Sequence, residues 1–402
     1  MVMLHTGRHF LQIPGPTNVP DRILRAMDHP VIDHRGPEFA SLTSEVLQGL
    51  GAVFQTTGSI VVFPSSGTGA AEAALVNTLS PGDRVLIFET GHFSNVWRTL
   101  AERLGLDVEN VPGTWRHGAS DIELERRLAA DDRHTFKAVV VVHNETSTGV
   151  TSRIRDLRQA MNRAGHPALL IVDAVSSLAS IDYRQDEWQV DVTITGSQKG
   201  LMLPPGLGLN AISPKALEAN KTARLSRHYW DWQEVLKQNR IGFFPYTPAT
   251  NLLYALREAL RMLQEEGLQN VFRRHTRHAE TARAAVRAWG LELVCEDPRE
   301  YSSSMTAFFM PEGYDADYLR AVILEHFDVS LGTGLTKFAG KVVRVGHLGA
   351  FNDVMLAGTL SAIEMGLRLA GVPHRDGGVM AARESLTPVN RDAQRAVAAQ
   401  SG

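Results

Sequence analysis

Short apolar runs alternate with amphipathic stretches through the first 250 residues of the chain. The runs are rich in β-branched residues and mostly free of polar ones, as expected for strands that helices cover on both faces. They span residues 60–63, 85–88, 138–142, 169–172, 192–195 and 207–212. Between them lie segments of helical periodicity, such as residues 153–164, whose apolar positions fall on one face. Strands separated by helices predict an α/β fold with a mostly parallel sheet.

The pattern changes after about residue 249. Two long helices are expected at 252–266 and 268–289, followed by a smaller α+β region with strands at 291–294, 305–310 and 342–345 and helices at 316–327 and 353–370. From residue 371 periodicity is lost, so we expect a mobile or surface tail. The chain is therefore divided into an N-terminal arm (1–20), a large α/β domain (21–265), a small C-terminal α+β domain (266–372) and a tail (373–402).

Composition excludes several classes of protein. The net charge of −3 offers no basic excess for nucleic-acid phosphates, so no nucleic-acid partner is expected. Apolar runs of strand length are too short to span a membrane, and the first ten residues do not resemble a secretory signal. The single cysteine, Cys295, cannot form an internal disulfide or a cysteine-rich metal site, and no metal is predicted. These features favour the cytoplasm.

A lysine follows the expected strand at 192–195. Residues 196–200 read Gly-Ser-Gln-Lys-Gly, which places Lys199 between glycines at the end of a strand, where open α/β sheets bind ligands. Small neighbours permit the close approach of a bulky cofactor, and Gln198 offers an amide beside the amine. An ordinary solvated lysine in a turn is the alternative. The pattern is typical of a lysine that bonds covalently to a carbonyl cofactor.

Two further strand ends carry polar residues. Asp173 closes the apolar run 169–172, and because burying an unpaired carboxylate is costly, a cation such as a pyridinium nitrogen is expected beside it. Residues 64–69 (PSSGTG) join a strand to a helix and can present backbone N–H groups to a phosphate. Taken alone, Asp173 or residues 64–69 could equally be a turn or helix cap with no functional role. A phosphate cradle, an aspartate and a lysine on strand ends together indicate a pyridoxal-phosphate enzyme.

Five motifs occur in the order found in one family. They are PGPTNVP at 14–20, SGTG at 66–69, HNETSTG at 143–149, DAVSS at 173–177 and GSQKG at 196–200. With them, the chain from about residue 13 to 371 resembles the class V pyridoxal-phosphate aminotransferases, in the branch of the serine–glyoxylate and alanine–glyoxylate enzymes. The resemblance implies fold type I, with a large domain built on a mostly parallel seven-stranded sheet and a smaller C-terminal domain.

The resemblance also implies roles for single residues. Lys199 would bond to pyridoxal 5'-phosphate and then move the substrate α-proton. Asp173 would pair with the ring nitrogen, Phe93 would stack on the ring, and Thr146 would reach the ring oxygen. The phosphate and the rest of the cofactor would contact Ser66, Gly67, Thr68, Val175 and Gln198.

Substrate and subunit contacts follow from the same resemblance. Arg344, inside the apolar run 342–345, matches the arginine that binds the substrate carboxylate, for which a planar guanidinium is suited. Asn18 is expected to help hold that carboxylate. Family members are homodimers that share active sites, and Tyr246 and Thr247 match a loop that reaches the partner's cofactor phosphate. Phe244 stands where some relatives have a tyrosine, so either aromatic residue could line the neighbouring site.

The expected reaction is transfer of the amino group of a small L-amino acid to glyoxylate, with L-serine as the favoured donor. Alanine or aspartate as donor and pyruvate as acceptor stay open alternatives. Arg35 could supply the second cation that an aspartate-using enzyme needs. A cysteine desulfurase is disfavoured because Cys295 sits in a strand-like apolar stretch rather than on a mobile loop. A non-catalytic relative is disfavoured because Lys199, Asp173 and Arg344 are all present.

Overall fold

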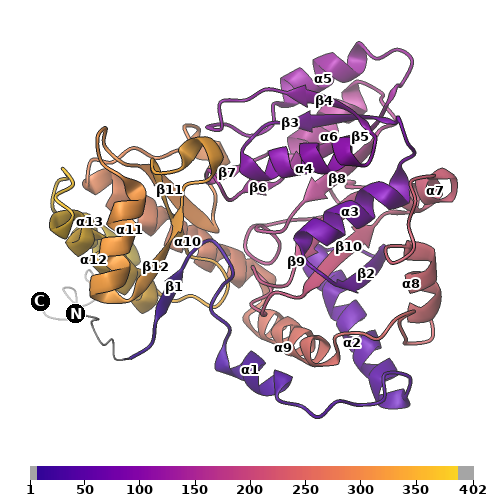
Figure 1. The fold of residues 1–402 in the computed structure, drawn as a ribbon, viewed down its shortest axis with the longest axis horizontal. Helices are drawn as coiled ribbons and strands as arrows, with labels where there is room; N and C mark the ends of the chain where they lie inside the picture. Colours follow the sequence, from indigo (N-terminus) through magenta and orange to yellow (C-terminus); the bar gives the residue numbers. More distant parts are fainter. Residues whose placement is uncertain (1–6, 388–402) are drawn as a thin grey trace, which may run out of the picture.

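A seven-stranded sheet forms the centre of the larger part of the molecule (Figure 1). The computed structural model describes residues 7–387. The strands of this sheet are β2 (Ser59–Pro64), β3 (Arg84–Phe88), β4 (Asp107–Val111), β5 (Phe136–Val142), β8 (Leu169–Asp173), β9 (Val192–Gly196) and β10 (Leu207–Ile212). Their order is β2-β10-β9-β8-β5-β3-β4, with β10 antiparallel to both neighbours and the other pairs parallel. The predicted mostly parallel sheet is confirmed.

Helices cover both faces of this sheet. One face packs against α2 (Pro37–Phe54), α5 (Asp121–Ala129), α6 (Ile154–Arg163) and α9 (Thr250–Glu266). The other packs against α3 (Gly67–Thr78), α4 (His92–Arg103), α7 (Pro214–Thr222) and α8 (Trp232–Asn239). Along β2, Ile60 and Val62 enter the first core while Val61 and Phe63 enter the second, because successive side chains of a strand point to opposite faces. This double burial explains the uninterrupted apolar runs.

A smaller four-stranded sheet lies beside the first (Figure 1). Its strands are β1 (Phe10–Gln12), β12 (Val329–Thr333), β13 (Val342–Gly346) and β11 (Met305–Phe309), in that order. Its helices are α10 (Leu268–Ala288), α11 (Ala316–Phe327), α12 (Asp353–Leu369) and α13 (Gly378–Leu386). The remaining elements are α1 (Asp21–Met27), the hairpin β6 (Asn144–Glu145) with β7 (Val150–Thr151), and 3-10 helices at Pro298–Glu300 and Thr336–Phe338. Within residues 7–387, no helix is both long and apolar enough to cross a bilayer.

Some predicted elements differ from the structure. The strand expected at 291–294 is wrong, since Leu293 makes a single bridge to Phe308 and its neighbours are irregular. Strands β4 and β12 were not predicted, because their polar and glycine residues interrupt any apolar run. The loss of helical periodicity expected from residue 371 is also wrong in part: α13 packs on α10, with Ala382 buried and Thr281 hydrogen-bonded to Ser385 (2.8 Å). Residues 388–402 of the predicted tail lie outside the described residues.

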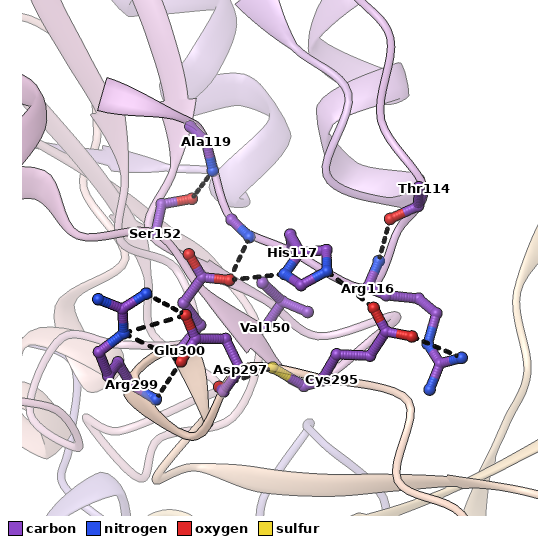
Figure 2. A network of polar contacts seen from close by, with 12 residues as sticks. Thr114, Arg116, His117, Ala119, Val150, Ser152, Cys295, Asp297, Arg299 and Glu300 are labelled. Atoms are coloured by element: carbon purple, nitrogen blue, oxygen red, sulfur yellow. Dashed lines mark hydrogen bonds and ion pairs between the residues drawn. The ribbon is translucent and has the colours of Figure 1, made fainter. Parts of the chain in front are cut away.

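A polar network joins the two parts of the molecule. The loop after β4 meets the segment that follows α10, and in Figure 2 the ring of His117 points toward Glu300. The Gly118 N–H donates to the buried Glu300 carboxylate (2.9 Å), and His117 Nε2 contacts Glu296 (2.8 Å). Arg116 adds bonds to the Val294 carbonyl (2.9 Å) and to Glu296 (3.0 Å). These contacts hold the smaller sheet against the larger one.

Candidate active site

A cavity of about 190 Å³ opens where β5, β8 and β9 end. Parallel pairing of β8 with β9 places Asp173 and the turn carrying Lys199 at the same edge of the sheet. Nine residues predicted from the sequence line the cavity: Ser66, Gly67, Thr68, Phe93, Thr146, Asp173, Val175, Gln198 and Lys199. The site is therefore assembled from strand ends, as expected for an open α/β sheet.

Lys199 is a buried amine. Its side chain follows β9 and only 8% of the residue is exposed. Burial and the nearby charge of Arg344 lower the pKa of Lys199 to about 8, and Asp173 partly opposes the shift. An amine with such a pKa is partly neutral near pH 7–8, which is the form that attacks a carbonyl or accepts a proton.

A strap from the N-terminal arm, residues 13–17, crosses over this lysine. The Lys199 amine donates to the Pro14 carbonyl, and Thr17 contacts the lysine backbone through Oγ1 (3.3 Å). Gly15 has a φ of +89°, and a side chain there would overlap Lys199. Because β1 pairs with β12, the strap ties the smaller sheet to the lysine.

Both oxygens of Asp173 accept hydrogen bonds from the protein. Trp97 Nε1–H donates to Oδ2 (2.8 Å) and the Val175 N–H donates to Oδ1 (2.9 Å). Burial raises the pKa of Asp173, whereas these two donors and the charge of Lys199 lower it. The sequence predicted a cation beside this carboxylate, but gave no hint that an indole would hold it.

The first turn of α3 forms the predicted anion cradle. Ser66 is the N-cap residue, with its hydroxyl accepting from the Gly69 N–H (3.4 Å), and the following N–H groups lie at the positive end of the helix. A Cβ at Gly67 would lie 2.7 Å from Val175 Cγ2, so glycine is needed there. Among residues 7–387, the buried Gln198 Oε1 has no hydrogen-bond partner, which leaves an acceptor at the cavity for a ligand donor.

Glu145 is a site residue that was not predicted. Its fully buried carboxylate accepts the N–H groups of Phe93 (3.0 Å) and Ser94 (3.2 Å) at the start of α4, and the Ser147 hydroxyl (2.6 Å). Burial raises its pKa to about 7 against these donors. Glu145 is separated from the apolar run 138–142 by His143 and Asn144, so the argument applied to Asp173 does not mark it, and only the fold shows its burial.

Arg344 lies on β13, next to the cavity rather than in its lining. Its Nε donates to the Thr333 carbonyl (2.6 Å) and its Nη1 to the Thr146 carbonyl (2.8 Å), so the guanidinium plane is fixed. Burial lowers the pKa of Arg344 to about 10. Asn18 donates to the carbonyl of Leu11 in β1 (3.0 Å), a contact within the N-terminal arm. Its predicted role toward a substrate stays a prediction.

Tyr246 and Thr247 do not line the cavity of their own chain. The Tyr246 hydroxyl donates to the Val62 carbonyl (3.2 Å), and its ring stacks on Tyr229 with centroids 4.8 Å apart. Thr247 is exposed, and Phe244 is buried against Phe39. Their predicted contacts with a partner's site stay predictions.

Neither Cys295 nor a metal-binding cluster forms a second centre in the described residues. Cys295 is buried, and burial raises the pKa of its thiol to about 12, so it is a poor nucleophile. In residues 7–387, no three His, Cys, Asp or Glu side chains gather in a way that could hold a metal ion.

Known proteins share this sequence and this architecture. A family model described as aminotransferase class-V matches residues 9–347. A serine–glyoxylate aminotransferase of Methylorubrum extorquens is 49% identical (96% of this chain and 97% of the relative), and an L-aspartate–glyoxylate aminotransferase of Paracoccus denitrificans is 45% identical (98% and 100%). The crystal structure of an alanine–glyoxylate aminotransferase from Nostoc sp. superposes with a TM-score of 0.85 at 32% identity, over 91% of this chain and 97% of that one. The chain belongs to the class-V aminotransferase family.

Proposed function

We propose that the chain is a pyridoxal-phosphate-dependent aminotransferase that moves the amino group of L-serine to glyoxylate, giving hydroxypyruvate and glycine. The observation that carries the proposal is the joint position of Lys199, Asp173 and the α3 cradle around one cavity. Serine is favoured because relatives at 45–49% identity, from Methylorubrum extorquens, Hyphomicrobium methylovorum and Arabidopsis thaliana, are named serine–glyoxylate aminotransferases. The aspartate–glyoxylate relative makes aspartate the second candidate donor.

The residues present fit pyridoxal phosphate. Helix α3 offers N–H groups and the Ser66 hydroxyl to a phosphate, and Asp173 presents a carboxylate to a ring nitrogen. When bound, the cofactor supplies an electron sink for the charge left at the α-carbon after proton removal. Phe93 and Val175 line the same cavity and would bound the two sides of the ring.

The side chains then divide the work. Arg344 binds the carboxylate of the amino acid or keto acid, with its plane set by the Thr333 and Thr146 carbonyls. The Lys199 amine, with a pKa near 8, accepts the proton from the substrate α-carbon and donates it to the cofactor carbon that carries the transferred nitrogen. The Pro14 carbonyl and the strap exclude water from the amine on the side facing the smaller sheet.

Three further expectations belong to this proposal. A homodimer would bring Tyr246 and Thr247 to the neighbouring subunit's phosphate, which agrees with their position outside their own cavity. The division at 20, 265 and 372 is proposed as the domain organisation, with Gly267 (φ +78°) between α9 and α10 as its hinge. The cytoplasm stays the predicted compartment.

The test is the visible spectrum of the purified protein during addition of L-serine, L-alanine and L-aspartate in separate titrations. Bleaching by serine, reversed by glyoxylate with formation of glycine, is the expected result. Bleaching by aspartate alone would make aspartate the amino donor in place of serine. Reversal by pyruvate but not by glyoxylate would make pyruvate the amino acceptor in place of glyoxylate. A yellow protein that no amino acid bleaches would overturn the substrate class, and a protein that stays colourless with added pyridoxal phosphate would overturn the cofactor.

A further inference from the structure

Helix α4 carries two residues of the cavity one turn apart. Phe93 lies in its first turn and Trp97 four residues later, so both side chains project from the same face of the helix. The Trp97 ring is buried (2% exposed), and its N–H donates to Asp173 at the end of β8. A single helix thus supplies a lining residue of the cavity, Phe93, and a hydrogen-bond donor to Asp173, which lines the same cavity.

The two donors on Asp173 restrict that carboxylate in different ways. The Val175 N–H comes from the same chain segment and moves with Asp173. Trp97 comes from a separate element, so its bond fixes the rotation of the carboxylate relative to the cavity. A carboxylate that accepts an N–H on each oxygen is stabilised in its ionised form and still has lone pairs to accept a third donor.

We propose that Trp97 is a positioning residue: its indole N–H orients Asp173 and keeps it ionised, so that the carboxylate can pair with the ring nitrogen of the cofactor. This inference rests on the proposed function, since it concerns the same site. Trp97 acts through Asp173 and has no chemical role of its own. Glu145 places the helix that carries it, by capping α4 at Phe93 and Ser94.

The chain contains a matched control for this tryptophan. Trp115 is equally buried (1% exposed), and its Nε1–H donates to the carboxylate of Glu89 at the same distance of 2.8 Å. Trp115 lies outside the cavity lining, against Phe338. Replacing it with phenylalanine therefore removes an equivalent hydrogen bond and an equivalent volume without touching Asp173.

The first experiment examines the hydrogen bond itself in the cofactor-free protein. The indole ¹⁵N–H resonances of the six tryptophans are recorded, and the Trp97 signal is assigned by its loss in Trp97→Phe. In Asp173→Asn the Trp97 resonance is expected to move upfield, while the Trp115 resonance stays in place. A Trp97 resonance that is unchanged in Asp173→Asn would overturn the inference, whatever the enzyme catalyses.

The second experiment measures how the two residues act on the cofactor. Trp97→Phe is expected to weaken pyridoxal-phosphate affinity by about 10-fold, as loss of a hydrogen bond to a charged group predicts, and to shift the absorption maximum of the bound cofactor. In the Asp173→Asn background the same substitution should change the affinity by less than about 3-fold and leave the absorption maximum in place. The reason is that the carboxylate charge is already absent there. Trp115→Phe should leave affinity and spectrum as in the wild type.

Two outcomes would overturn the inference and leave the proposed function intact. One is a Trp97→Phe protein with wild-type affinity and spectrum. The other is an equal loss from Trp97→Phe in the wild-type and Asp173→Asn backgrounds, which would show that Trp97 acts by packing alone. Failure of the wild-type protein to bind pyridoxal phosphate would instead overturn the proposed function, and the resonance experiment would still decide whether Trp97 holds Asp173.

Discussion

Loss of the buried Lys199 amine should abolish turnover, whereas loss of an exposed lysine should leave turnover unchanged. Lys199→Ala removes the amine whose pKa burial lowers to about 8, so turnover should fall by at least about 1,000-fold. Transamination is measured by glycine formation, and thermal unfolding checks that the fold survives. The control is Lys221→Ala on α7, an exposed lysine paired with Glu218, which should keep wild-type activity. An active Lys199→Ala protein would contradict the site assignment.

Arg344 should separate substrate binding from cofactor binding. Arg344→Ala is expected to raise the KM for both the amino acid and glyoxylate by about 100-fold while the protein stays yellow, because an ion pair of about 2–3 kcal/mol is lost. Arg344→Lys should recover little, since a single ammonium nitrogen cannot reproduce the separated, coplanar N–H groups that reach the Thr333 and Thr146 carbonyls and a carboxylate. Steady-state kinetics and the absorption spectrum check both variants, and loss of the yellow colour would show a role in cofactor retention instead.

Single residues were predictable where a motif or an unusual position marked them. Lys199 and Asp173 follow apolar runs, and the structure shows that their strands are neighbours. Trp97 was not predicted because a tryptophan at helical spacing is usually a core residue, and only the fold shows which carboxylate its N–H meets. Glu145 was not predicted although it stands next to Thr146, the one residue of its motif that was given a role.

Elements were predictable in proportion to how fully they are buried. The central strands β5, β8 and β9 are covered on both faces and matched their apolar runs closely. The edge strands β4 and β1 are short and partly exposed, so their sequences carry no comparable signal. Pairing of β1 with β12 joins segments at opposite ends of the chain, which local periodicity cannot indicate.

The start of α4 offers a test at the level of an element. In Gly91→Ala the new Cβ would overlap Glu145 and the Ser147 hydroxyl, so the first turn of α4 must shift. We expect about 10-fold weaker cofactor binding and a lower free energy of unfolding, by about 1–3 kcal/mol. Gly358→Ala in α12 is the control: its Cβ would meet only Phe10, at 3.5 Å, so this variant should be unchanged or up to about 1 kcal/mol more stable. Cofactor titration and urea unfolding measure both.

The whole molecule should lose stability in mild acid. His143, His275 and His347 are buried, and burial lowers the pKa of the first two to about 3 and that of His347 well below its ordinary 6.5. The unfolded chain therefore binds more protons, so their contribution is complete above pH 6.5 and is lost as the pH falls below it, by about 1.4 kcal/mol per pH unit for each histidine. Urea unfolding at pH 7 and pH 5 measures this loss. His275→Asn should show a smaller pH dependence than the wild type.

The junction in Figure 2 predicts unequal costs for two glutamates. Glu300→Ala removes a buried carboxylate and leaves the part-buried Gly118 N–H without its acceptor, so the free energy of unfolding should fall by about 2–3 kcal/mol. Glu296→Ala removes ion pairs that face solvent, so it should cost less than about 1 kcal/mol and the cost should shrink in salt. Urea unfolding at low and high salt compares the two, and equal costs would show that the ion pairs dominate the junction.

The pairing of β1 with β12 also sets an order of events during synthesis. His9 and Asp328, which meet beside this pair, are 319 residues apart in the chain. At 5–20 residues per second the ribosome needs roughly 15–60 s to make that span. The larger sheet is complete in sequence at Ile212 and can form within that interval. The anchor of the strap on the smaller sheet is therefore made late, and until β12 has left the ribosome the strap can be held over Lys199 only by its own contacts with the lysine turn.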